Sequence, residues 1–155
     1  YVSYQLNNLN AGITLSDAES ELGAFDQYQS LDGARLDRQQ GTTISANAGY
    51  QLTEYDIVLN WEMLWVDDVD AGLDLDGASL DNSKDGYSVH NISAKWAPEN
   101  IQGLTVIFGV DNLFDEYYAS QSSRTGVSFH PRFQELYLMD YEPGRNIKAT
   151  LAYAF

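Results

Sequence analysis

The stretch RNIKATLAYAF, residues 145–155, decides how this chain folds. Every second residue from Ile147 to Phe155 is apolar, and the residues between them are small or polar. A period of two over about ten residues is typical of a β-strand with one apolar side and one water-facing side. Soluble sheets show the same alternation, but they seldom leave a terminal Phe ring in water, whereas lipid accommodates one. We therefore expect the final strand of a membrane barrel, with Phe155 at the membrane interface.

Composition narrows the class of protein. The 155 residues include 23 acidic and 8 basic side chains, for a formal net charge of -15, and no Cys. The length favours one domain, 1–155, and the missing Cys excludes disulfides and thiolate metal sites. The acidity argues against a nucleic-acid partner, because phosphate binding needs Lys and Arg. No apolar run reaches the roughly 18 residues of a membrane helix. The opening YVSYQL is strand-like and is no signal peptide, so we expect a processed chain or the tail of a longer one.

Alternation recurs in six further segments. The clearest is 55–65, where six large apolar residues share one side, opposite Asn60 and Glu62. This pattern predicts an outward apolar band of membrane height, with aromatic residues toward both ends. A strand in the core of a soluble sandwich is the alternative. The other strands are expected at 1–6, 9–15, 42–52, 87–96 and 104–118.

The connections between these segments alternate in length. Those at 6–10, 53–54 and 98–103 are short, and those at 17–40, 67–86 and 119–144 are long. Outer-membrane barrels show this asymmetry, with short periplasmic turns and long extracellular loops. About seven strands cannot close a barrel, so the fold class is an all-β, antiparallel transmembrane barrel of which this chain supplies the C-terminal strands.

Two motifs carry a family resemblance. GVDNLFDEYY (109–118) and YEPGRNIKATLAYAF (141–155) resemble the C-terminal end of TonB-dependent outer-membrane receptors. In that family an N-L-F-D segment lies on the penultimate strand, and a P-G-R segment opens a last strand that ends in Phe. The matching residues here are Asp111, Asn112, Leu113, Phe114, Asp115, Pro143, Gly144, Arg145 and Phe155.

The resemblance implies a bacterial outer-membrane receptor with a 22-stranded barrel. An N-terminal plug, absent from these residues, would close the barrel and engage the TonB complex. The other implied partners are outer-membrane lipid and lipopolysaccharide, the remaining strands, and an iron-bearing ligand or its carrier protein. YEPGRN (141–146) looks more like the heme and hemoglobin branch than the siderophore branch. Heme would then be a transported ligand, and no resident cofactor is expected.

The motif residues also have physical roles. Asp111 and Asn112 can bind main chain left free by a local irregularity. Pro143 and Gly144 suit the start of the last strand, since Pro donates no ladder hydrogen bond and Gly permits positive φ. Arg145 is expected to pair with a loop or lumen carboxylate. We predict structural roles for this set rather than ligand contact.

No catalytic set stands out, and we expect no enzyme. His90 and His130 are the only imidazoles, and His90 is expected to belong to the structure of the outer rim. Heme iron is commonly held by His or Tyr, so the loop residue His130 is a candidate ligand contact. The alternative is a turn shaped by the following Pro. The full set of candidate ligand contacts is His130, Tyr137, Arg132, Arg124, Phe129 and Tyr28.

The acidic loop LDLDGASLDN (73–82) is a calcium candidate through Asp74, Asp76 and Asp81. It lacks the bidentate Glu at position twelve that an EF-hand requires. The alternative is a solvated acidic loop.

Import of an iron-bearing ligand is the function that the sequence favours. Two alternatives stay open: a siderophore or cobalamin receptor of the same family, and a small structural or adhesive outer-membrane barrel. A plug domain of roughly a hundred residues upstream would exclude the small barrel.

Overall fold

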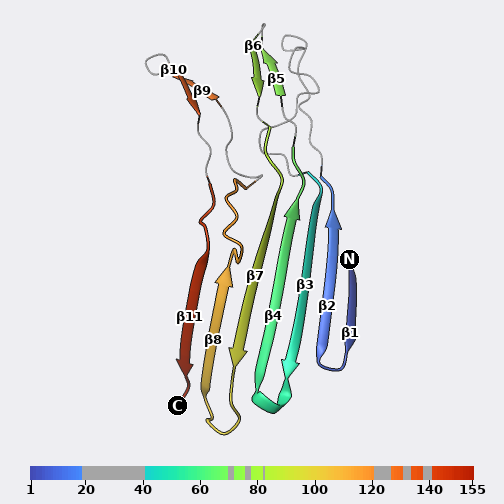
Figure 1. The fold of residues 1–155 in the computed structure, drawn as a ribbon, viewed down its shortest axis with the longest axis vertical. Helices are drawn as coiled ribbons and strands as arrows, with labels where there is room; N and C mark the ends of the chain where they lie inside the picture. Colours follow the sequence, from blue (N-terminus) through green and yellow to red (C-terminus); the bar gives the residue numbers. More distant parts are fainter. Residues whose placement is uncertain are drawn as a thin grey trace.

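The computed structural model describes residues 1–18, 41–69, 83–120 and 141–155. It also describes the main chain of four short strands at 72–75, 78–81, 127–130 and 134–137. Seven strands form one antiparallel sheet, in the order β1-β2-β3-β4-β7-β8-β11 (Figure 1). Their bounds are β1 Val2–Leu6, β2 Leu9–Ser16, β3 Thr43–Leu52, β4 Ile57–Val66, β7 Tyr87–Trp96, β8 Leu104–Asp111 and β11 Asn146–Tyr153.

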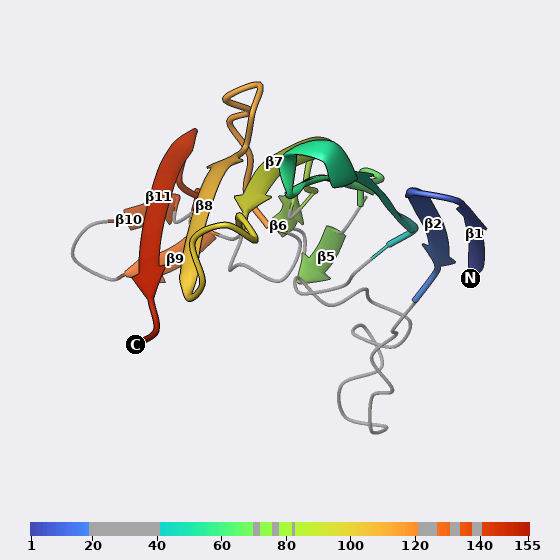
Figure 2. The same cartoon turned by 90° about the horizontal axis from the view of Figure 1, so that it is seen from below.

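The sheet is an open, curved wall whose free edges are β1 and β11 (Figure 2). The short connections β1–β2, β3–β4 and β7–β8 lie at one end of the sheet. The strand ends that lead into the long connections lie at the other end, the long-loop end (Figure 1). The predicted segregation of loop lengths is therefore present. The predicted fold class is confirmed: the chain is an all-β antiparallel sheet of seven strands, not closed on itself.

The two faces of the sheet differ in chemistry because neighbouring strands pair in register. One row of paired residues on the apolar face reads Leu9, Tyr50, Leu59, Ala94 and Phe108. On the opposite, polar face a row reads Gly12, Asn47, Glu62 and Asn91. Large side chains on the apolar face are widely exposed, among them Ile13, Tyr50, Phe108, Ile147 and Leu151. An exposed apolar surface of this size is typical of a face that contacts a membrane or another protein.

Two strand boundaries differ from the sequence expectation. Tyr55 belongs to the 3₁₀ turn η2, Thr53–Tyr55, and Asp56 follows it with φ 54°, so β4 begins only at Ile57. The strand expected at 104–118 ends at Asp111, because Asn112 takes φ 50° and leaves the ladder. The period of two is already lost there, because the apolar residues beyond Asp111 come in adjacent pairs, Leu113-Phe114 and Tyr117-Tyr118.

Two hairpins lie within segments expected to be loops. Strands β5 (Gly72–Leu75) and β6 (Ala78–Asp81) pair with each other, as do β9 (Val127–His130) and β10 (Gln134–Tyr137). Both hairpins lie beyond the long-loop end of the sheet (Figure 1).

Buried apolar residues gather near that end, on the polar face. Val66, Tyr87 and Val89 form the cluster, and Tyr118 packs against it. Among the residues that the structure describes, no helix is long and apolar enough to cross a membrane.

Candidate functional site

Asn112 is the centre of the turn that follows β8. Its side chain is 3% exposed and its backbone is left-handed, a conformation that Asn tolerates better than most residues. The side-chain amide donates to the Glu116 carbonyl and accepts from the Glu116 amide, both at 2.8 Å. The main-chain N–H of Asn112 donates to Oδ1 of Asn91 at 2.9 Å. The side chain thus closes the turn and the main chain ties it to β7.

Asp115 links this turn to the last strand. Its Oδ1 accepts from the Arg145 amide at 2.8 Å, and the carboxylate lies so close to Gly144 that a Cβ there would meet Oδ1 at 2.7 Å. The expectation that this Gly serves a positive φ is wrong, because Gly144 does not have one. The close approach of the Asp115 carboxylate explains the Gly instead. The expected carboxylate partner of the Arg145 guanidinium is not found among the described residues. The main chain of Arg145 makes the contact instead.

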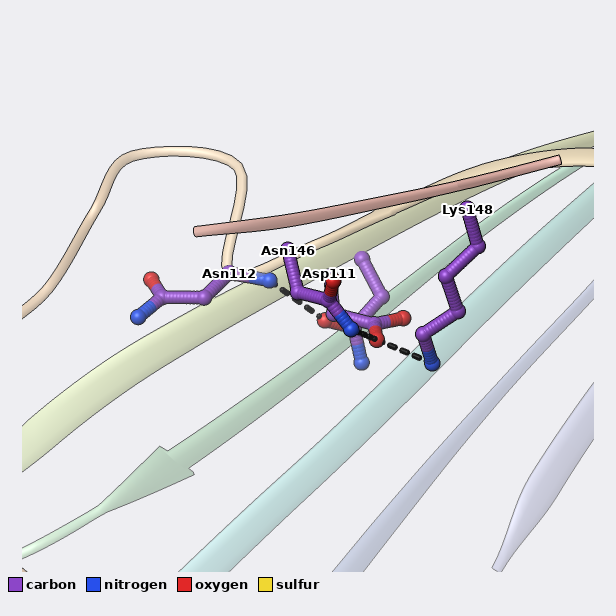
Figure 3. Close-up of polar contacts among 5 residues, drawn as sticks. Asp111, Asn112, Asn146 and Lys148 are labelled. Carbon is purple, nitrogen blue, oxygen red and sulfur yellow. Dashed lines mark hydrogen bonds and ion pairs between the residues drawn. The ribbon is translucent and has the colours of Figure 1, made fainter. Parts of the chain in front are cut away.

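The polar face carries an ion pair between Asp111 and Lys148 (Figure 3). Their strands β8 and β11 are neighbours, and Asn146 lies directly opposite Asp111. Both side chains are about half exposed, so water screens the pair and its stabilisation is expected to stay below about 1 kcal/mol. The pair borders a hollow of about 230 Å³, whose lining also includes Asn60, Glu62, Asn91, Ser93 and Thr150.

A cluster of Tyr rings lies at the long-loop end of the sheet. The Tyr87 and Tyr118 rings are 4.3 Å apart between centroids, and those of Tyr117 and Tyr141 stack at 4.1 Å. Burial raises the pKa of the Tyr118 phenol above its ordinary value of 10.0, and the charges of Glu142 and Tyr87 raise it further. Sequence reasoning missed these contacts, although the EYY run at 116–118 was the available signal.

His90 lies on the apolar face of β7, opposite Met63. Its Nδ1 accepts from Trp61 Nε1 at 3.2 Å, and its Nε2 lies 3.2 Å from Ser88 Oγ. Because an indole N–H can only donate, Nδ1 is the acceptor of this neutral ring and Nε2 carries its proton. Phe114 meets the imidazole edge-on, with centroids 5.0 Å apart. These contacts join His90 to β4 and to the turn after β8.

The predicted ligand contacts fall outside the residues whose side chains are described. Tyr28, Arg124 and Arg132 lie entirely outside the described residues, and Phe129, His130 and Tyr137 are placed by main chain only, on β9 and β10. For the calcium candidate, Asp76 lies outside, and Asp74 and Asp81 are placed by main chain on β5 and β6. Within the described ranges, no group of three or more His, Asp or Glu could hold a metal ion.

Known proteins share this fold and part of the sequence. No protein-family model matches the chain. Proteins named TonB-dependent heme receptor A, from two strains of Haemophilus influenzae, are 37% and 36% identical to it over 70 residues. Each match covers 45% of this chain and only 8% of the relative's length.

Solved structures match nearly the whole chain. The copper transporter OprC has a TM-score of 0.70 at 20% identity and matches 99% of this chain. The ferric enterobactin receptor PfeA of Pseudomonas aeruginosa has a TM-score of 0.70 at 18% identity, also over 99%. The FrpB iron transporter of Neisseria meningitidis has a TM-score of 0.66 at 19% identity over 97%. The chain spans 21% to 22% of the length of each of these proteins.

The chain therefore shares its fold with part of each of these transporters and receptors. Its N-L-F-D and P-G-R segments meet through Asp115 and the Arg145 amide, beside the polar face. In this chain they hold the turn after β8 against β7 and β11.

Proposed function

We propose that the chain forms the C-terminal wall of a TonB-dependent outer-membrane receptor that imports an iron-bearing ligand, with heme or hemoglobin-borne heme favoured. The observation that carries the proposal is the 37% identity over 70 residues to proteins named TonB-dependent heme receptor A. The two-faced sheet and the segregated loops support the membrane setting.

In this proposal the apolar face meets lipid and the polar face lines the barrel interior. The plug and the remaining strands would come from the rest of the receptor, and energy would come from the TonB complex through the plug. The ligand and any carrier protein would arrive at the long-loop end, where β9 and β10 stand (Figure 1). Heme would be cargo rather than cofactor.

Growth on defined iron sources tests the proposal. A host without its own iron receptors would express the complete receptor, with heme, hemoglobin or a ferric siderophore as sole iron. A matched strain without TonB is the control. We expect TonB-dependent growth on heme or hemoglobin, and heme bound by the purified receptor. Growth on a siderophore alone, with no heme bound, would reject heme as ligand. No growth advantage on any iron source would favour a structural or adhesive barrel.

His130 allows a test at the level of one side chain. We propose that it belongs to an adaptable loop surface with Tyr28, Arg124, Phe129, Arg132 and Tyr137, since aromatic and Arg side chains are enriched at such contacts. In heme-type receptors of the resembled family, the axial heme ligands are expected on the plug and on an earlier outer loop, both outside this chain. His130→Ala should therefore lower heme uptake only a few-fold. His90→Ala is the matched control for losing an imidazole away from the loops. Complete loss of uptake in His130→Ala alone would assign His130 a principal role instead.

A further inference from the structure

The register of the last strand is not explained by the alternation of its side chains. Strand β11 pairs with β8 so that Asn146 faces Asp111. A slip by one residue would turn every side chain to the wrong face, but a slip by two keeps each apolar residue on the apolar face. The connection between the two strands, 112–145, is too long to fix the pairing as a short turn does. Within this sheet, a further contact has to distinguish the observed register from its neighbours.

The ion pair between Asp111 and Lys148 distinguishes these registers only weakly. Both side chains are about half exposed, so water screens their attraction. Lys148 pairs with Gly109 and therefore lies diagonally across the ladder from Asp111. A slip that brought Lys148 directly opposite Asp111 would keep the two charges neighbours. The ion pair does not exclude that slip.

The chain is longer on the β8 side of this pair than on the β11 side. Beyond the ladder pair of Asp111 and Asn146, the two sides pair again at Ala119 and Tyr141. Between those pairs the β8 side has seven residues and the β11 side has four, namely 112–118 and 142–145. The three extra residues are accommodated by the turn after β8, which carries Asp115.

Asp115 contacts the chain just before β11. Its Oδ1 accepts a hydrogen bond from the Arg145 N–H at 2.8 Å, and a Cβ at Gly144 would lie 2.7 Å from the same oxygen. The contact therefore requires a residue without a side chain, followed by a residue with a main-chain N–H. Gly144 is the only Gly in 141–155, so no other position on this side of the ladder meets the first requirement.

A slip of β11 by two residues toward the long-loop end loses this contact. Lys148 would then face Asp111, and Asn146 would take the place of Gly144. The Cβ of Asn146 would meet the Asp115 carboxylate, as a Cβ at Gly144 would. The turn would have to move away, and its hydrogen bond to the last strand would be lost.

The opposite slip, toward the short connections, also loses the contact. Gly144 would then face Asp111, and Glu142 and Pro143 would lie beside the turn. The Glu142 side chain would meet the carboxylate, and Pro143 would stand in the place of the donor although Pro has no N–H. The hydrogen bond and the close approach are therefore both confined to the observed register.

We propose that Asp115 and the Gly144-Arg145 dipeptide form a register latch, which holds β11 on β8 in one of the registers that the alternation allows. A slip by two residues moves a strand by about 7 Å along its length. Closing a barrel requires a fixed stagger between strands, so the slip would displace the free edge of β11. The register latch thus sets the position of that edge. That a further strand pairs there rests on the proposed function, whereas the register of β8 and β11 does not.

Disulfide formation between introduced Cys residues measures the register, because the chain has no Cys of its own. Phe108→Cys is combined with Ala149→Cys, its partner in the observed register, or with Leu151→Cys or Ile147→Cys, its partners after either slip. The complete receptor, with any Cys elsewhere replaced by Ser, is oxidised in the outer membrane, and linked peptides are quantified by mass spectrometry. Since Cα atoms more than about 7 Å apart cannot be bridged, the Ala149 product should exceed the other two roughly tenfold.

Breaking the register latch should let slipped pairs form. Asp115→Ala and Gly144→Ala are each expected to lower the Ala149 product and to raise a slipped product about fivefold, because even slips keep the faces matched. Asp115→Asn keeps an acceptor oxygen and should retain the observed register. Asp17→Ala is the matched control, since Asp17 also accepts a side-chain hydrogen bond, from Thr42 Oγ1. Equal slipping in Asp17→Ala, or no slipping in either latch variant, would overturn the proposal.

Moving the glycine gives a test with a direction. In Gly144→Ala combined with Asn146→Gly, the sole glycine of 141–155 lies two residues later. The register latch then fits only after the slip toward the long-loop end, so the Leu151 product should become the main one. A general loss of stability would favour no single slipped pair.

This variant decides if the single variants do not assemble. A main product at Ala149, or failure of the moved-glycine receptor to assemble, would overturn the proposal. Growth on iron sources is a separate readout, so failure of the import proposal would remain distinguishable.

Discussion

Asn112 shows how one side chain ends a strand and holds the next segment. Its side-chain amide is hydrogen-bonded to both the C=O and the N–H of Glu116, while its own backbone has φ 50°. An Asn is suited to both tasks, because it tolerates left-handed backbone and carries a donor and an acceptor. The sequence motif is therefore explained by local geometry that needs no ligand.

Asn112→Ala is expected to destabilise the assembled receptor by about 2 to 4 kcal/mol, because two buried main-chain groups lose their partners and Ala tolerates the backbone less well. The measurement is the urea midpoint of unfolding from detergent or vesicles. Asn7→Ala is the matched control, since Asn7 also has positive φ, 47°, and lies in an exposed turn. Asn7→Ala should lower the free energy of unfolding by about 1 kcal/mol. Equal costs would assign the whole effect to backbone strain.

Tyr118 should make stability sensitive to alkaline pH. The folded state raises its pKa, chiefly through burial and then through Glu142 and Tyr87, so the folded protein holds this proton more tightly than the unfolded chain. The contribution is fully present below the unfolded value of 10.0 and is lost as pH rises through the folded pKa. Unfolding measured from pH 8 to above pH 10 should therefore show a smaller alkaline loss in Tyr118→Phe. An unchanged slope would contradict this.

At the scale of the element, β4 is the clearest case of a strand with two chemistries. Trp61, Met63 and Trp65 lie on the apolar face, and Asn60 and Glu62 lie on the polar face, as their cross-strand partners require. Leu64, next to Met63, also lies on the polar face although it is apolar, and it is 40% exposed. That exception supplies a control on the same strand.

Met63→Arg is expected to cost roughly 2 to 4 kcal/mol if the apolar face meets the middle of a bilayer, since a charge there loses its hydration. Leu64→Arg, one residue further on and on the opposite face, should cost less than about 1 kcal/mol because the guanidinium can stay hydrated. Folding yield and unfolding midpoint in vesicles are the measurements. Similar costs for both variants would show that Met63 does not face lipid.

At the scale of the molecule, the seven strands leave two unpaired edges, β1 and β11. Unpaired N–H and C=O groups cannot face hydrocarbon, and in water they invite pairing with other chains. Closure needs strands beyond the seven, in keeping with a chain that spans 22% of the length of OprC.

Residues 1–155 prepared alone should therefore not give a stable monomer in detergent. Size-exclusion chromatography should show aggregates, and co-expression with the rest of the receptor should recover an assembled barrel. A monodisperse, heat-resistant species of 17.3 kDa would show that the seven strands close by themselves.

The sequence by itself determined the seven strands of the main sheet, the face of that sheet to which their alternating residues belong, and the alternation of short and long connections. These features are local: a period of two appears in every strand without knowledge of its neighbours. The strand expected at 104–118 ran past the true end of β8 at Asp111, although the adjacent apolar pairs Leu113-Phe114 and Tyr117-Tyr118 already break the period of two.

Only the tertiary structure decided which side chains meet. The pairs Asp111 with Lys148, Trp61 with His90, and Tyr87 with Tyr118 join different strands or a strand with a loop. The row Tyr50, Leu59 and Ala94 on the apolar face likewise depends on three strands lying in one register. Register is fixed by turns and by the packing of whole faces, so a shift of one residue would replace every such contact while leaving each strand's own pattern intact.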